Sequence, residues 1–187
     1  MTNKLMPGEK VPELKVNILN GEDWKLSEDA FTNMKLIVFY RGLHCPLCKA
    51  YVGELDKKIN EFAQLDIDIV AISGDSEEKA KLTKAKWNLQ EIKIGYNHSV
   101  ESMAKWGLYI SEGAFPSEPS LFNEPGIFLI KSDKTLFFAG VNNAPFARPP
   151  LDDLISGIKY ITTNDYPVRG TVEMSKYNMV EELITNT

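Results

Sequence analysis

The sequence predicts an α/β fold with a parallel-rich, mixed central sheet flanked by helices on both faces. Two observations lead to this prediction. Short apolar runs at 35–40 and 67–73, partly β-branched, are typical of strands that are covered on both faces. A segment with apolar residues at helical spacing follows the first run, and a segment with a capping residue and acidic residues in its first turn follows the second, as in units where a helix joins two parallel strands. At 187 residues, the chain is long enough for one domain with a sizeable core.

The order of the predicted elements narrows the fold further. A strand–helix–strand unit is followed by two strands and a last helix, which is the thioredoxin arrangement, and a β-hairpin precedes it as an N-terminal extension. The stretch 109–124 has no convincing period and is predicted to be a surface loop. In chain order we expect hairpin strands on either side of Asn20-Gly21, a strand at 35–40, a helix through 52–62, a strand at 67–73, a helix capped by Asp75 or Ser76, a strand at 91–96, a helix at 99–106, strands at 126–130 and 135–141, and a helix at 151–161.

One domain and a tail account for the whole chain. We expect a thioredoxin-like domain over residues 1–163 and a C-terminal tail over residues 164–187, where the pattern is weak. The tail is a candidate for packing on the domain or for exchange between the subunits of a homodimer.

Composition limits the partners and the compartment. The net charge is −5, from 21 basic and 26 acidic residues, which argues against a nucleic-acid or anionic-membrane partner. The first residues lack the apolar stretch of a secretion signal, and no apolar run approaches the ~20 residues of a membrane span. We therefore expect a cytoplasmic protein. In that reducing compartment a cysteine pair is catalytic, redox-sensing or metal-binding rather than a structural disulfide.

The chain has two cysteines, Cys45 and Cys48, directly after the strand at 35–40. Pro46 suits the first turn of a helix, so Cys45 is predicted at a helix N-terminus, where free amides and the helix dipole favour a thiolate. Such sites lower the pKa of a cysteine, and Arg41 and His44 could add positive charge. Cys48 lies one turn further on the same face, well placed to attack an oxidised Cys45.

Two other interpretations of the pair stay open. Buried cysteines three residues apart can be core residues, although a proline between a strand and a helix makes this less typical. A zinc site would need both cysteines and both histidines of the chain, and His44 adjoins Cys45, which is not the usual ligand spacing. His98 is predicted near a helix cap and is assigned no chemistry.

The segment "LIVFYRGLHCPLCKAYVGEL" resembles the active-site strand and helix of the alkyl hydroperoxide reductase/thiol-specific antioxidant family, the peroxiredoxin-like branch of the thioredoxin superfamily. Within that family it is similar to members with a Cys-Pro-x-Cys motif. Weaker similarities follow in the family's order. They are the opening "PGEKVPELKVNILNGEDWKLSE", the middle "IDIVAISGDSEEKAKLTKAKWNL" and "SVESMAKWGLY", and the closing "EPGIFLIKSDKTLFFAGV" with "ARPPLDDLISGI".

The resemblance implies roles for five residues. Cys45 is expected to be the attacking, peroxidatic cysteine and Cys48 the resolving one. Pro125 falls where thioredoxin-like proteins place a cis-proline that faces the pair, and Arg148 is expected to match a family arginine that precedes the last helix. Arg41 is a candidate substitute for the family's other arginine, whose position Pro125 takes.

The sequence also departs from the family's peroxide-binding motif. Typical members carry Pro-x-x-x-Thr-x-x-Cys, but Val38 and Gly42 stand at the proline and threonine positions here. This chain therefore has fewer hydrogen-bond donors to polarise the O–O bond than typical members, and its reduction of peroxide is expected to be slower than theirs.

Three functions follow as hypotheses. The first is a peroxidase that cycles Cys45 and Cys48 between dithiol and disulfide, with a thioredoxin- or glutathione-type reductant and no cofactor or metal. The second is a thiol–disulfide oxidoreductase that acts on protein or small-molecule disulfides. The third is a non-catalytic thioredoxin-fold binding module.

Overall fold

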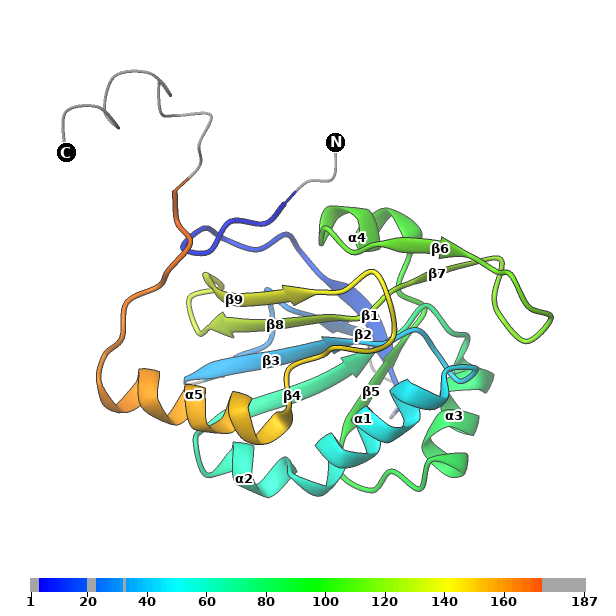
Figure 1. Cartoon of the computed structure of the whole chain (residues 1–187), viewed down its shortest axis with the longest axis horizontal. Helices are drawn as coiled ribbons and strands as arrows, with labels where there is room; N and C mark the ends of the chain where they lie inside the picture. Colours follow the sequence, from blue (N-terminus) through cyan, green and yellow to red (C-terminus); the bar gives the residue numbers. More distant parts are fainter. Residues whose placement is uncertain (1–3, 20–22, 32, 173–187) are drawn as a thin grey trace, which may run out of the picture.

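The computed structural model describes residues 4–19, 23–31 and 33–172 (Figure 1). Within these residues strands and helices alternate much as predicted. The strands are β1 (Lys15–Ile18), β2 (Asp23–Lys25), β3 (Met34–Phe39), β4 (Ile67–Ile72), β5 (Lys93–Tyr96), β6 (Ile110–Glu112), β7 (Leu121–Asn123), β8 (Gly126–Lys131) and β9 (Leu136–Val141), and the helices are α1 (Pro46–Lys57), α2 (Ile59–Ala63), α3 (Glu77–Lys86), α4 (Val100–Lys105) and α5 (Leu151–Thr163).

Seven strands form one mixed sheet in the order β2-β1-β5-β4-β3-β8-β9. Only the pairs β3–β4 and β4–β5 are parallel, and the hairpins at both edges are antiparallel. The predicted N-terminal hairpin is confirmed, with Val16 opposite Trp24, although its turn at Asn20-Gly21 lies outside the described residues. The mixed sheet of a thioredoxin-like fold is thus confirmed.

The two faces of the sheet carry separate cores, because alternate residues of a strand point to opposite faces. From β3, Leu36 and Val38 join a core built with α1, α2, α3 and α5. Ile37 and Phe39 join a second core with α4 and the N-terminal segment. Figure 1 shows α1, α2 and α5 together on one side of the sheet, and α4 with β6 and β7 on the other. All six residues of β3 are buried, and five of them are apolar, as predicted for a strand covered on both faces.

Two predicted elements are wrong in detail. The helix expected through 52–62 breaks at Lys58, whose backbone (φ −96°, ψ 5°) leaves the helical region, so it becomes α1 and α2. The stretch expected to be a loop, 109–124, contains the two-stranded sheet of β6 and β7, with Ser111 opposite Phe122. These strands have three residues each, too few for a period to show in the sequence.

A lysine lies inside the buried strand β3. Lys35 is fully buried, and its ammonium contacts the carboxylates of Asp29 and Asp68. The ammonium also lies 5.5 Å from the ring centre of Trp24 and 5.1 Å from that of Phe31. Two carboxylates and two aromatic rings therefore replace the water that the charge loses on burial.

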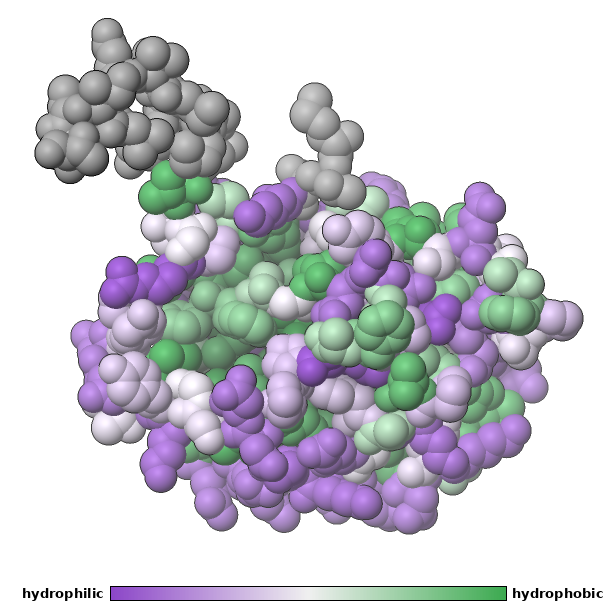
Figure 2. Space-filling view, viewed as in Figure 1, coloured by the Kyte–Doolittle hydropathy of each residue, from purple (hydrophilic) through white to green (hydrophobic). Residues whose placement is uncertain are grey.

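An apolar hollow of about 320 Å³ lies between α5 and the hairpin of β8 and β9. Its walls are mainly Leu129, Phe137, Phe138, Leu154, Ile158 and Ile161. Figure 2 shows this region as a recessed hydrophobic area. Of the tail predicted over 164–187, residues 173–187 lie outside the described part of the chain. No helix among the described residues has the length and apolar character needed to cross a membrane.

Candidate active site

Cys45 lies between β3 and α1 and is the N-cap of the helix, with Pro46 as its first residue. The cap backbone is extended (φ −94°, ψ 107°), and Cys45 Sγ accepts a hydrogen bond from the amide of Cys48 at 3.2 Å. The amide of Cys45 in turn donates to Gly42 O at 3.1 Å. The predicted position at a helix N-terminus is confirmed: the sulfur occupies the place of a capping oxygen and receives a free helix amide.

The two thiols are free, and their surroundings separate their pKa values. A hydrogen bond from the Cys48 side chain, helped by the Cys48 amide and by Arg41 and opposed by burial, lowers the pKa of Cys45 to about 6. The same hydrogen bond, then burial and the charge of Cys45, strongly raise the pKa of Cys48. Cys45 is therefore the thiolate at neutral pH, and Cys48 is the proton-bearing partner.

Arg41 lies beside Cys45 in a cluster of opposite charges. Its Nη2 is 3.1 Å from a carboxylate oxygen of Glu118, and its Nε is 3.3 Å from one of Glu124. The guanidinium carbon is 4.7 Å from the ring centre of Phe122. Glu118 and Glu124 thus hold the guanidinium in place and also reduce its net positive field.

His44 adds no charge to the site. Its ring lies edge-on to Phe122 at 4.9 Å between centres, and burial, together with Arg41, lowers the pKa of the imidazole. It is neutral at pH 7, so of the two cationic neighbours considered, only Arg41 supplies charge. His98 is also neutral, because burial lowers its pKa to about 4; it stacks on Phe39 and lies next to Ser99, which caps α4.

Gly42 stands where a threonine is typical, and the structure gives the reason. Its φ is +129°, and a Cβ placed on it would lie 2.7 Å from a carboxylate oxygen of Asp75. The same carboxylate accepts the amide of Leu43 at 2.7 Å, while Ser76 rather than Asp75 caps α3. Burial raises the pKa of Asp75. A carboxyl group from the loop between β4 and α3 therefore fills the space beside the turn that leads to Cys45.

We expect Gly42→Ala to lower the free energy of unfolding by about 1–3 kcal/mol, because alanine is strained at this φ and its methyl group meets Asp75. Gly53→Ala in α1 is the matched control: nothing lies within 4 Å of its added Cβ, and alanine favours a helix by about 1 kcal/mol. Urea unfolding of both variants checks this, and equal stabilities would contradict the geometry.

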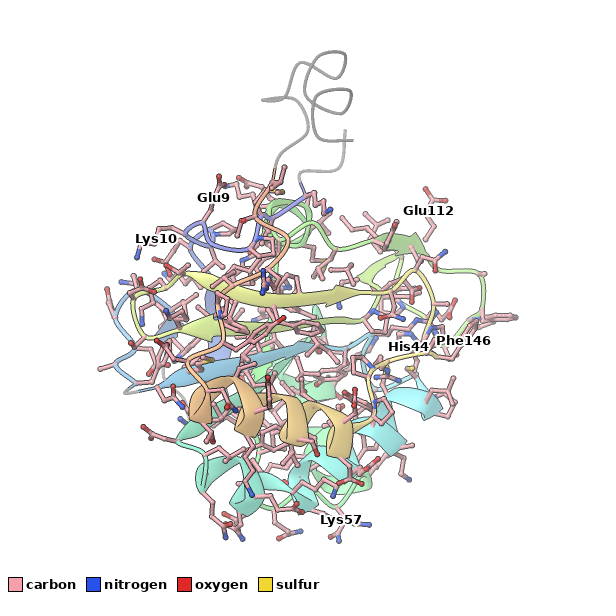
Figure 3. The ribbon with its side chains drawn as sticks, turned by 60° about the vertical axis from the view of Figure 1, so that its left-hand side comes forward. Glu9, Lys10, His44, Lys57, Glu112 and Phe146 are labelled. Atoms are coloured by element: carbon pink, nitrogen blue, oxygen red, sulfur yellow. The ribbon has the colours of Figure 1, made fainter. Side chains whose placement is uncertain are left out.

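The structure changes the expectation for Pro125 and places Arg148, as predicted, just before the last helix. The Glu124–Pro125 bond is trans, so the cis-proline prediction is wrong. The chain from β7 to β8 is held by Glu124 N, which donates to Tyr109 O, and by Pro125 O, which accepts from Asn142 N. Arg148 lies by Cys48 rather than Cys45: its Nη2 donates to Leu47 O at 2.9 Å, and its charge opposes the rise in the pKa of Cys48. His44 and Phe146, from the two loops that meet here, lie at the same end of the molecule (Figure 3).

Three residues of the site, Asp75, Glu118 and Glu124, were not predicted as site residues. Each is a common acidic residue in or next to a loop or a short strand, and no motif singles it out. Among the described residues, no three histidine, cysteine, aspartate or glutamate side chains come together to hold a metal ion.

Comparison with known proteins identifies the family. The model of the AhpC/TSA family matches residues 7–138 of this chain. The chain belongs to the AhpC/TSA family. As a member it is a thiol oxidoreductase, and the Cys45 and Cys48 thiols at the head of α1 are the groups that suit this chemistry.

Solved structures agree on the fold at low identity. A peroxiredoxin-like protein from Aquifex aeolicus is 18% identical, with 84% of this chain and 88% of that chain covered and a TM-score of 0.69. Peroxidoxin BcpB from Mycobacterium tuberculosis is 16% identical, with coverages of 84% and 99% and a TM-score of 0.69. AhpC from Mycobacterium bovis is 13% identical, with coverages of 90% and 98% and a TM-score of 0.70. No curated protein sequence matches the chain.

Proposed function

We propose that this AhpC/TSA chain is a thiol peroxidase in which Cys45 attacks a peroxide and Cys48 resolves the product. The observation that carries the proposal is the capped sulfur: Cys45 Sγ receives the Cys48 amide at 3.2 Å beside Arg41. With its pKa at about 6, about nine-tenths of Cys45 is thiolate at pH 7. Cys45 is 1% exposed, which favours a small electrophile over a bulky one.

The proposed cycle has three steps. The Cys45 thiolate attacks a peroxide oxygen, so that an S–O bond forms, the O–O bond breaks, and the departing oxyanion takes up a proton. Cys48, as thiolate, attacks the resulting sulfenic acid; an S–S bond forms, the S–O bond breaks, and the hydroxide leaves as water after taking up a proton. Two electrons have then passed to the peroxide, and a thioredoxin- or glutathione-type thiol reductant returns two and restores both thiols.

A specific observation favours a second function, thiol–disulfide exchange. Gly42, at the position where typical family members carry a threonine, offers no hydroxyl to a peroxide, and the Asp75 carboxyl group lies against it. With fewer hydrogen-bond donors for the departing oxygen, the rate at which Cys45 attacks a peroxide falls closer to the rate at which it attacks a disulfide.

The homodimer and the cytoplasmic location stay predictions from the sequence.

Stopped-flow measurements on the reduced protein separate the two functions. We expect hydrogen peroxide to oxidise Cys45 at least tenfold faster than a small model disulfide at equal concentration, with a rate that rises with pH to a plateau. The midpoint of the rise is expected near pH 6, because the reactive form is the thiolate, which is present above its pKa. A faster reaction with the disulfide would reject the peroxidase function in favour of thiol–disulfide exchange. If neither reagent reacts faster than free cysteine, both functions are lost.

A further inference from the structure

Arg148 forms a hydrogen bond to the first turn of α1, the turn that carries Cys48. Its Nη2 donates to Leu47 O at 2.9 Å and to Pro145 O at 2.7 Å. Its guanidinium carbon lies 4.6 Å from the ring centre of Tyr51, one turn after Cys48. The Tyr51 hydroxyl donates to Pro149 O at 2.9 Å. Two hydrogen bonds, one from Arg148 and one to the neighbouring Pro149, therefore link the loop before α5 to the start of α1.

One nitrogen of this guanidinium has no acceptor. Arg148 Nη1 is buried and makes no hydrogen bond with the described residues. A buried, charged N–H group without a partner is costly, and an anion beside it would remove that cost. Nη2 thus holds the guanidinium in place, while the buried Nη1 has no acceptor among the described residues.

Cys48 is the nearby group that must become negative. It is fully buried, and burial disfavours its thiolate. Two other polar groups face Cys48, the Cys45 thiolate and the hydroxyl of Tyr40, which follows β3. Neither carries a positive charge that could stabilise a Cys48 thiolate. Arg41 lies on the Cys45 side, and its backbone contributes a weak favourable contact. Arg148 is the cation whose charge favours the Cys48 thiolate.

We propose that the two arginines divide the cycle between them: Arg41 serves the attack by Cys45, and Arg148 stabilises the thiolate of Cys48 in the second half. This rests on the proposed Cys45–Cys48 cycle but not on the identity of the electrophile.

The chemistry explains why Cys48 needs its own cation only in the second step. While Cys45 is a thiolate, it accepts a hydrogen bond from the Cys48 thiol and repels a second negative charge on Cys48. When Cys45 becomes a sulfenic acid, that repulsion is gone and burial is left as the main obstacle. Cys48 then gives up its proton and attacks the Cys45 sulfur, and the oxygen of the sulfenic acid leaves as water with that proton. When a reductant later cleaves the disulfide by attacking Cys45, the electron pair returns to Cys48 as thiolate beside Arg148.

The first test is a titration that needs no turnover. In a Cys45→Ser background, Cys48 is titrated by thiolate absorbance with Arg148, Arg148→Gln, Arg148→Lys or Arg41→Gln. We expect Arg148→Gln to raise the pKa of Cys48 by about one pH unit or more, because a cation at close range favours a thiolate. Arg148→Lys restores part of this shift, and Arg41→Gln leaves it nearly unchanged. An unchanged titration in Arg148→Gln, or an equal effect of Arg41→Gln, would overturn the proposal.

The second test follows the steps in the chain with both cysteines. After one equivalent of peroxide, or of a small disulfide if that is the faster electrophile, Arg148→Gln should form the Cys45–Cys48 disulfide about tenfold more slowly with little change in the first attack. Arg41→Gln should show the reverse. Tyr51→Phe is the structural control: it breaks the contact with Pro149 O but keeps the charge, and should leave the pKa of Cys48 in place. If Tyr51→Phe reproduces the effect of Arg148→Gln, Arg148 acts only by holding the loop. Failure of both electrophiles would reject the proposed function, while the titration would still decide the role of Arg148.

Discussion

Cys45→Ser abolishes oxidation by peroxide and by model disulfides alike, with a fall of three orders of magnitude or more expected. Removing the nucleophile of a covalent enzyme costs up to about 10⁶ in rate, and a serine hydroxyl at the same helix cap is not ionised at neutral pH. The fold should not change, because Ser is itself a good N-cap residue and can accept the Cys48 amide. Peroxide consumption in a coupled assay and single-turnover oxidation monitored by mass spectrometry measure the loss.

Cys48→Ser is the matched variant for this prediction. It keeps the first attack with little change in its pH midpoint, because the serine hydroxyl can donate to the Cys45 thiolate in place of the Cys48 thiol. Its product should stop at a sulfenic acid or a mixed disulfide on Cys45 instead of an internal disulfide. If Cys45→Ser still consumed peroxide at the normal rate, or if Cys48→Ser lost the first attack entirely, the assigned roles of the two thiols would be wrong.

Lys35→Met lowers the free energy of unfolding by about 3 kcal/mol at pH 7. The substitution keeps the volume of the side chain but leaves the carboxylates of Asp29 and Asp68 without their buried cation, and breaking such a pair costs about 3–5 kcal/mol when both charges are buried. The lower end applies here because the side chains of Asp29 and Asp68 are 20% and 35% exposed. Urea unfolding monitored by tryptophan fluorescence gives the value.

The loss in free energy of unfolding caused by Lys35→Met should become smaller as the pH falls. Burial alone would raise the pKa of Asp68, but Lys35 and, to a lesser extent, Lys93 lower it below 3.8 in the folded protein. That contribution to stability is present above pH 3.8 and is lost as the pH falls through the folded pKa, so the difference between variant and parent shrinks in acid. Lys93→Met is the control: its ammonium also contacts Asp68, at 3.1 Å, but its side chain is 51% exposed, and we expect a loss of only about 0.5 kcal/mol. Equal losses for the two variants would show that the burial of Lys35 does not matter.

The sequence by itself determined most of the elements and their order, but not β6, β7 or the break between α1 and α2. The largely apolar runs predicted β3 and β4, helical spacing predicted α1 and α5, and the order of the elements predicted the thioredoxin arrangement. Pro46 between the two cysteines placed Cys45 at a helix start. These features are local: a strand, a helix and a cap are each encoded within a few consecutive residues, and a short window of sequence is enough to see them.

The tertiary structure decided which charges surround the two thiols. Asp75 reaches Gly42 and Leu43 across more than thirty residues of sequence, Glu118 reaches Arg41 across 77, and Arg148 reaches the turn of Cys48 across about a hundred. No pattern of neighbouring residues encodes such contacts, because they depend on how the loops at one end of the sheet fold over one another. The same is true of Lys35, whose burial depends on Asp29 and Asp68. The sequence therefore predicted Cys45 as the nucleophile of the proposed cycle, while only the packing of distant loops made the surroundings of Cys45 different from those of Cys48.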